Sequence, residues 1–338
     1  MVIIKKKKKK KKLGIVKKIM VLLVIVILTM IGIAASNIYS KISKVDFIAI
    51  NKEDLAVNSK IYDEVSDTLS ESEFSDIKTV VFFGVDSTDM TDGVSGRSDT
   101  IMIASLNPKI KGISLLSIPR DTYVNIPGHG KDKINHAYAY GKEQLSIKTI
   151  NQNFGLNISE YVTIDFSGLI SIINEVGGIN LKINQEEMKY INERVGESYL
   201  ISGNTAKQLT KYGDATLSGE QALTHSRNRT AGDDFVRAGR QRKVLSSLIN
   251  KLSSLNLPGI IKASDSILKE VKTNINITDY MGSILSTISN KDTYIANMVS
   301  AQVPAADYST GKTINGTYYF TTNYDKAKSD FVKYIYGK

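Results

Sequence analysis

Three apolar runs of strand length lie close together between residues 79 and 119, and they constrain the fold more than any other feature of this chain. Their sequences are TVVFFGVD (79–86), TIMIASLN (100–107) and GISLLSIP (112–119). Each run ends at a turn signal, as buried strands usually do. Asn107-Pro108 and Gly112 indicate a hairpin between the second and third runs.

Helical and strand patterns alternate after these runs. Helices are expected near 142–153, 167–178, 218–226, 234–253, 258–270, 278–289 and 323–335, and strands at 161–166, 179–183 and 293–303. Asn315-Gly316 indicates a hairpin. The alternation predicts an α/β domain with one central, mixed sheet.

The N-terminal segment carries a membrane signal. Ile19–Ala35 contains seventeen residues of which only Thr29 is polar, and ten lysines precede it. By the positive-inside rule we expect residues 1–18 to be a basic cytoplasmic tail and residues 19–36 a transmembrane signal-anchor. A cleaved signal peptide is the alternative, with Ala35-Ser36 as the nearest cleavage site. Residues 37–75 then read as a stalk and 76–338 as the extracytoplasmic domain.

The net charge of +10 comes entirely from that tail. Without the ten lysines, 34 basic and 34 acidic residues remain. A neutral domain argues against nucleic acid as a partner, because nucleic-acid binding normally needs a basic surface. The lysines themselves suit attraction to anionic membrane lipid. The chain has no cysteine, which excludes disulfides and Cys-based zinc sites.

Arginine is rare and concentrated. The 338 residues include 36 lysines and eight arginines, and five of the arginines lie in SRNRTAGDDFVRAGRQR (226–242). Arg97 and Arg120 also stand close to aspartates. A guanidinium grips phosphate with two parallel hydrogen bonds, which lysine cannot do. This distribution predicts a site for a phosphate-bearing ligand.

The arginine cluster has an expected geometry. Arg227 and Arg229 alternate at a helix end, so they can grip one group from the same side. Arg237 and Gln241 are four residues apart and share a helix face with the apolar stripe Val244, Leu245, Leu248 and Leu252. The pair is therefore expected to face inward. Arg240 and Arg242 lie off this stripe, and we expect them on a solvated face.

Two aspartates are candidate metal ligands. Asp86 ends the first run and Asp99 opens the second, so a hairpin-like return would bring both carboxylates together. Such a pair suits a hard divalent cation; helix caps or turn acids are the alternative. Arg120 either contacts phosphate or forms a structural ion pair with Asp121. Lys133 could add a point charge to a phosphate, but taken alone it reads as a surface residue. His129, His136 and His225 read as satisfied structural residues.

Six motifs in this order resemble the LytR–CpsA–Psr family of Gram-positive cell envelopes: FFGVD, GRSDTIMI, SIPRDTYVNIPG, KINHAYAYG, VTIDFSG and the arginine cluster. The resemblance runs from about Thr79 to Leu245. It implies a three-layer α/β/α domain with a channel for a polyprenyl chain. The implied reaction moves an anionic glycopolymer, such as teichoic acid or capsule, from polyprenyl pyrophosphate to a peptidoglycan hydroxyl.

The resemblance also implies residue roles. Asp86 and Asp99 would hold Mg²⁺ or Mn²⁺, and the phosphates would be bound by Arg97, Arg120, Arg227, Arg229, Arg237 and Gln241. Arg120, Arg229 and Asp234 would take part in catalysis, Asp234 by orienting an arginine or assisting proton transfer. The chain departs from the family at Ser87, where many relatives have arginine, and at His225, where tyrosine is usual.

Two other functions use the same features. A hydrolase would act on the same lipid-linked pyrophosphate with water as the acceptor. A non-catalytic envelope module would have a binding or regulatory role without chemistry. The motifs do not name the acceptor, so these alternatives stay open.

Overall fold

The structure, a computed structural model, describes residues 46–47, 49–85, 96–204, 207–228, 234–255, 259, 263, 269–276 and 290–338. Residues 45–338 form one compact unit. The predicted tail and transmembrane segment, residues 1–36, lie outside the described residues. No helix within the described ranges combines the length and the apolar character that crossing a bilayer requires.

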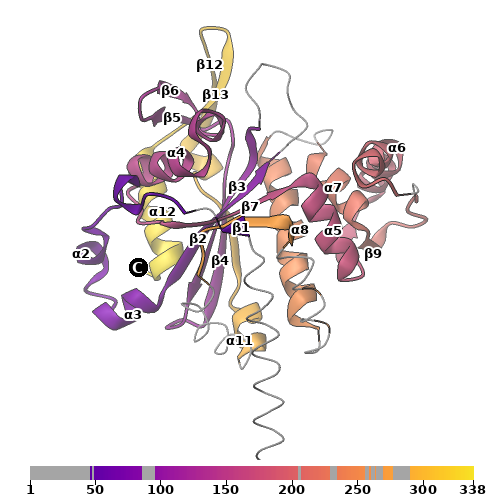
Figure 1. The fold of residues 1–338 in the computed structure, drawn as a ribbon, viewed down its shortest axis with the longest axis horizontal. Helices are drawn as coiled ribbons and strands as arrows, with labels where there is room; N and C mark the ends of the chain where they lie inside the picture. Colours follow the sequence, from indigo (N-terminus) through magenta and orange to yellow (C-terminus); the bar gives the residue numbers. More distant parts are fainter. Residues whose placement is uncertain are drawn as a thin grey trace, which may run out of the picture. The chain divides into compact units, whose positions relative to one another are not determined.

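Seven of the described strands form the central sheet, in the order β1-β10-β7-β2-β3-β4-β11 (Figure 1). β2 pairs antiparallel with β3 and parallel with β7, so the sheet is mixed, as predicted. The hairpin predicted between the second and third runs is β3–β4. The strands are β1 Asp46–Phe47, β2 Lys78–Val85, β3 Ser98–Asn107, β4 Gly112–Ile118, β7 Glu160–Asp165, β10 Val271–Thr273 and β11 Val299–Gln302.

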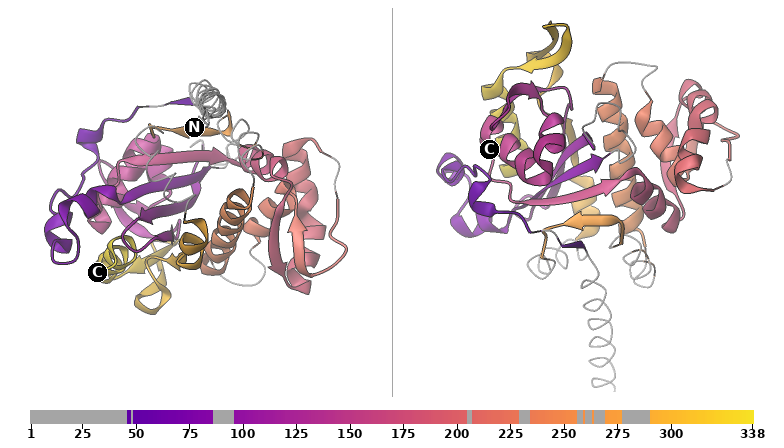
Figure 2. Two further views of the ribbon diagram at one scale, coloured as in Figure 1. Left: turned by 90° about the horizontal axis from the view of Figure 1, so that it is seen from below. Right: turned by 45° about the horizontal axis from the view of Figure 1, so that its top comes forward.

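Helices cover both faces of this sheet (Figure 2). On one side lie α2 Ile61–Val65, α3 Glu71–Asp76, α4 His136–Phe154 and α12 Tyr324–Tyr336, and on the other α5 Phe166–Glu175, α6 Gln185–Ser202, α7 Gly219–Arg227 and α8 Asp234–Ser253. Alternate residues of the strands face opposite sides. Phe83 and Ile103 belong to the core under α4 and α12. A second core joins α5, α6 and α8 through Ile173, Val195 and Val244.

Several smaller elements surround the sheet. η1 Lys52–Asp54, α11 Lys291–Ala296 and η3 Ala306–Tyr308 are short helices. β5 Tyr123–Ile126 pairs with β6 Gly130–Lys133, and β12 Ser309–Ile314 pairs with β13 Thr317–Thr322. The predicted turn at Asn315-Gly316 is confirmed, because both residues have the positive φ, 51° and 79°, that a tight hairpin turn favours.

The structure differs from the sequence predictions in four respects. The stalk predicted for 37–75 is wrong in its second half, because Leu55, Ile61, Val65 and Leu69 are buried in the core. The strand predicted at 179–183 is confirmed as β8 Ile179–Ile183, but it pairs with β9 Gly213–Leu217 outside the central sheet. The strand predicted at 293–303 begins only at Val299, after α11. No helix was expected where α6 lies. The helix expected at 278–289, and most of that at 258–270, falls outside the described residues.

Candidate active site

A cavity of about 340 Å³ lies between the central sheet and helices α5 to α8. Much of its lining is apolar, and three strands and three helices contribute to it. These residues are Phe82, Met102, Ile164, Phe166, Leu169, Leu223, Val244 and Leu245. The alternation of β2 and β3 explains the lining, since Phe82 and Met102 face the cavity while their neighbours face the other core. The cavity can therefore take a hydrocarbon chain.

Four of the predicted site residues line this same cavity, namely Asp99, Arg227, Arg237 and Gln241. We call them the polar end. They come from element ends: the start of β3, the last residue of α7 and the first turns of α8. Arg237 is 5% exposed, and it shares its helix face with Gln241 and Val244 as predicted. The inward-facing stripe of α8 is thus confirmed.

Arg120 stands beside the polar end and is fixed by two aspartates. Its Nη1 lies 2.7 Å from Oδ1 of Asp99, and its Nε lies 3.6 Å from Oδ2 of Asp121. Lys133 Nζ lies 2.8 Å from Oδ1 of Asp121. Lys133 is therefore part of this charge network rather than a solvated surface residue. The ion-pair reading of Arg120 is confirmed, and it includes Asp99 as well as Asp121, whereas contact of Arg120 with phosphate stays a prediction.

The remaining arginines differ in position. The guanidinium carbon of Arg227 lies 5.1 Å from the ring centroid of Phe166, which is a cation–π geometry. Arg227 still lines the cavity at its polar end. Arg97 is not among the cavity-lining residues. It lies near Tyr140, whose phenol pKa is raised by burial and by the hydrogen bond to Asp132, and the charge of Arg97 opposes that rise.

Three predicted residues are not described. Asp86, Arg229 and the side chain of Asp234 lie outside the described residues. Within the described ranges, no group of three or more His, Cys, Asp or Glu side chains gathers as a metal site would need. Asp99 is an oxygen ligand of the kind that Mg²⁺ or Mn²⁺ prefers, and it lines the cavity. The donor chemistry of Asp99 thus fits the implied metal, while the pair with Asp86 stays a prediction.

The expectation that Arg240 and Arg242 are solvated is wrong. Arg240 is 5% exposed; its Nε lies 3.1 Å from Oε1 of Glu187, and its Nη1 donates to the backbone oxygen of Asn228. Arg242 is part-buried and donates to Oγ of Ser117 on β4. α8 is covered on more than one side, so a single apolar stripe does not describe its environment.

The histidines also divide. His136 Nδ1 lies 2.7 Å from Asp132 Oδ2, and His129 stacks on Tyr140 with centroids 4.4 Å apart. His225 is 1% exposed, and neither ring nitrogen has a hydrogen-bond partner among the described residues. Burial lowers the pKa of His225 to about 4, helped by the charges of Arg240 and Lys243 and opposed by Glu187. The satisfied role predicted for His225 is therefore wrong.

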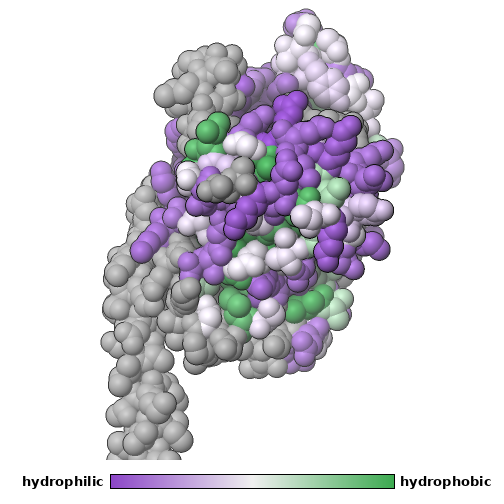
Figure 3. Space-filling view, turned by 90° about the vertical axis from the view of Figure 1, so that its right-hand side faces the viewer, coloured by the Kyte–Doolittle hydropathy of each residue, from purple (hydrophilic) through white to green (hydrophobic). Residues whose placement is uncertain are grey.

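α6 contributes cavity residues that sequence analysis missed: Tyr190, Arg194, Glu197 and Ser198. The face that carries α6 is mostly hydrophilic, with hydrophobic side chains visible between polar ones (Figure 3). The sequence does contain a signal for the start of this helix, because Asn184 and Glu187 form a capping box. Ile191, Val195 and Tyr199 follow at spacings of four and are buried, as in an amphipathic helix.

Known proteins are similar to this chain in sequence. The model of the LytR_cpsA_psr family matches residues 35–333. TagT of Bacillus subtilis, a polyisoprenyl-teichoic acid–peptidoglycan teichoic acid transferase, is 32% identical over 251 residues, which are 73% of this chain and 73% of that protein. The similarly named TagU of Enterococcus faecalis is 34% identical over 236 residues, 65% of this chain and 71% of that protein.

Solved structures share the fold. TagT bound to LIIa-WTA has a TM-score of 0.60 and 27% identity, and the match covers 79% of this chain and 94% of that one. The family protein YwtF (TagT) with bound octaprenyl pyrophosphate lipid has a TM-score of 0.57 and 26% identity, over 79% and 94% of the two chains. Fold, ordered motifs and family match agree, and this chain belongs to the LytR_cpsA_psr family.

Proposed function

We propose that this protein transfers an anionic glycopolymer of the teichoic acid type from a polyprenyl-pyrophosphate carrier to peptidoglycan. One observation carries the proposal: a single cavity joins an apolar lining to the guanidinium groups of Arg227 and Arg237. A prenyl chain needs the first and its pyrophosphate needs the second. The relatives named teichoic acid transferases, and the one solved with octaprenyl pyrophosphate lipid, support this assignment.

The described residues divide the work of the reaction. Arg227, Arg237 and Gln241 bind and orient the pyrophosphate at the polar end, because phosphoryl transfer mainly needs positioning and charge neutralisation. Arg120, held by Asp99 and Asp121, presents a fixed guanidinium beside them. The apolar lining holds the lipid and keeps water from the reacting phosphate. Roles for Arg97, Arg229 and Asp234 remain predictions.

A divalent cation and a membrane anchor complete the proposal. Asp99, together with Asp86, would hold Mg²⁺, which when bound would neutralise pyrophosphate charge. Residues 19–36 would anchor the chain, with the basic tail in the cytoplasm and the domain outside. That placement puts the polar end on the side of the membrane where peptidoglycan lies.

The test is a product assay on the full-length protein in detergent, with a short-chain polyprenyl-pyrophosphate glycan, peptidoglycan oligomers and Mg²⁺. Mass spectrometry would detect the glycan–phosphate–peptidoglycan product. We expect Arg237→Met to lower the rate at least about a hundredfold, because a buried charge-assisted contact to the pyrophosphate is lost. Lys243→Met, on the exposed face of the same helix, is the matched control and should keep full activity.

Other outcomes separate the alternatives. Release of lipid phosphate without the linked product would support the hydrolase. Tight lipid binding with neither product would support the non-catalytic module. Equal rates for Arg237→Met and the control would show that the polar end takes no part in the reaction.

A further inference from the structure

Arg242 carries a part-buried positive charge that has no counter-charge among the described residues. Its Nη1 donates a hydrogen bond to the neutral Oγ of Ser117, and its Nη2 lies 3.7 Å from where a Cβ would sit on Gly239. Burial lowers the pKa of Arg242, and within the described part of the chain its side chain has no ion pair with a carboxylate. A guanidinium does not give up its proton, so this charge costs free energy until an anion pairs with it.

The β-sheet register shows where this charge lies. Phe82, Met102, Ser117 and Gln302 are successive partners across β2, β3, β4 and β11, so they point to one face of the sheet. Phe82 and Met102 line the cavity, whereas Arg242 contacts this row of residues at Ser117, to which it donates a hydrogen bond. One turn further along α8, Ser246 contacts Met298, next to β11. Arg237 and Arg242 thus face opposite flanks of α8.

A second polar group on this flank lacks a partner. Gln302 Oε1 is buried and accepts no hydrogen bond among the described residues, while its Nε2 donates to the backbone oxygen of Pro304 at 3.3 Å. Parallel neighbours lie about 5 Å apart, so Gln302 stands beside the Ser117 that Arg242 holds. The flank therefore offers one cation in need of an anion and one acceptor in need of a hydroxyl.

We propose that Arg242, Ser117 and Gln302 form a subsite, the β11 flank, that binds a phosphate esterified to a polyol or a sugar. The phosphate pairs with Arg242, and a ligand hydroxyl donates to Gln302. This inference rests on the proposed function, since a polyol or sugar phosphate is the repeating unit that a teichoic acid type of polymer supplies. β4, which carries Ser117, ends at Ile118 two residues before Arg120, so one segment of the chain connects this flank to the guanidinium beside the polar end.

The test uses the full-length protein in detergent with saturating farnesyl diphosphate, which fills the cavity and its polar end. sn-Glycerol 3-phosphate is then titrated by calorimetry. We expect Arg242→Gln to weaken this second binding at least about tenfold, the value of one charge-assisted contact. The melting temperature of Arg242→Gln without ligand should equal or exceed that of the wild type, because an uncompensated buried charge is removed. Lys243→Gln removes the same charge from an exposed neighbour and should change neither quantity.

Gln302→Leu tests the hydroxyl contact. It should weaken glycerol 3-phosphate binding and leave inorganic phosphate binding unchanged. Equal affinity in Arg242→Gln and the wild type, or an equal loss in Lys243→Gln, would overturn the subsite. Equal binding of inorganic phosphate and glycerol 3-phosphate by the wild type would overturn its preference for an ester. Failure of farnesyl diphosphate to bind would instead count against the proposed function, and the effect of Arg242→Gln on glycerol 3-phosphate could still be measured.

Discussion

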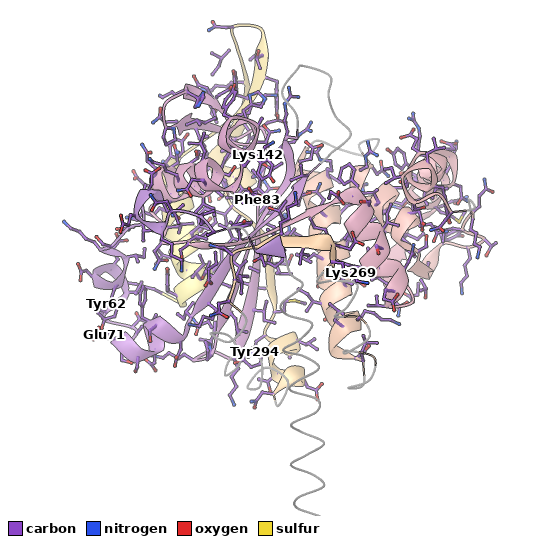
Figure 4. All side chains as sticks on the ribbon, in the orientation of Figure 1. Tyr62, Glu71, Phe83, Lys142, Lys269 and Tyr294 are labelled. Carbon is purple, nitrogen blue, oxygen red and sulfur yellow. The ribbon has the colours of Figure 1, made fainter. Side chains whose placement is uncertain are left out.

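Lys142 interrupts α4 with a backbone conformation that side chains with a Cβ rarely adopt. Its φ is 50° and its ψ is −145°, a region occupied almost only by glycine. Its Nζ lies 5.5 Å from the ring centroid of Tyr138 and 3.7 Å from where a Cβ would sit on Gly96. Figure 4 shows Lys142 beyond Phe83, toward the end of the sheet where β3 begins. The side chain is anchored locally while its backbone remains strained.

Replacing Lys142 with glycine should therefore stabilise the protein. Relief of the strain outweighs the added freedom of the unfolded chain, and we expect the free energy of unfolding to rise by about 1 kcal/mol. Denaturant unfolding measures the change. Lys142→Ala is the control, because it removes the same charge but keeps the Cβ and thus the strain. A gain in the alanine variant as large as that in the glycine variant would show that charge, not backbone strain, is responsible.

The environment of a single residue can be predicted from sequence when it is set by nearby residues in the chain. Arg237 and Gln241 were predictable because four-residue spacing places both on the stripe of α8 that continues to Val244. His225 was not, since its missing partners are a property of the residues that pack around it. Arg242 was misplaced for the same reason: Ser117, 125 positions away in the chain, covers it.

Among the elements, β2, β3, β4 and β7 of the central sheet were predictable and α6 was not. β2, β3 and β4 are continuous apolar runs, which leave few alternatives. α6 (Gln185–Ser202) contains many polar residues, and its buried face is narrow. The pairing of β8 with β9 spans α6, so it could not be seen before that helix was placed.

α7 brings Arg227 to the cavity by packing closely on α5, and this contact depends on Gly219. A Cβ on Gly219 would lie 2.3 Å from the backbone oxygen of Ile170, an overlap that only movement of a helix relieves. We expect Gly219→Ala to destabilise the protein by about 3 kcal/mol and to weaken prenyl diphosphate binding. Gly196→Ala is the matched control in α6, where a Cβ meets nothing within 4 Å. That change should stabilise by about 0.5–1 kcal/mol. Similar stability of both variants would contradict the close contact.

At the scale of the whole molecule, ionisable groups are buried beside the apolar second core. Arg240 of α8 pairs with Glu187 of α6, and His225 of α7 lies in their field. Burial pushes the pKa of Glu187 up, but hydrogen bonds from the Asn184 backbone and from Arg240 outweigh it, and the net pKa is lowered. Three helices around the cavity are thus held together in part by groups whose charge changes in acid.

This arrangement predicts a stability that falls in acid in two stages. The folded protein keeps His225 neutral down to a pKa of about 4, whereas the unfolded chain binds that proton near 6.5. Stability should therefore be complete above pH 6.5 and fall by roughly 3 kcal/mol, as an upper value, between pH 6.5 and 4. The lowered pKa of Glu187 adds a loss at the acid end of this range. The free energy of unfolding can be measured with urea across this pH range. In His225→Phe it should not change between pH 6.5 and the start of the Glu187 loss. His129→Gln, at an exposed position, should keep the pH dependence of the wild type. An unchanged slope in His225→Phe would mean that the buried imidazole is not the group that responds to acid.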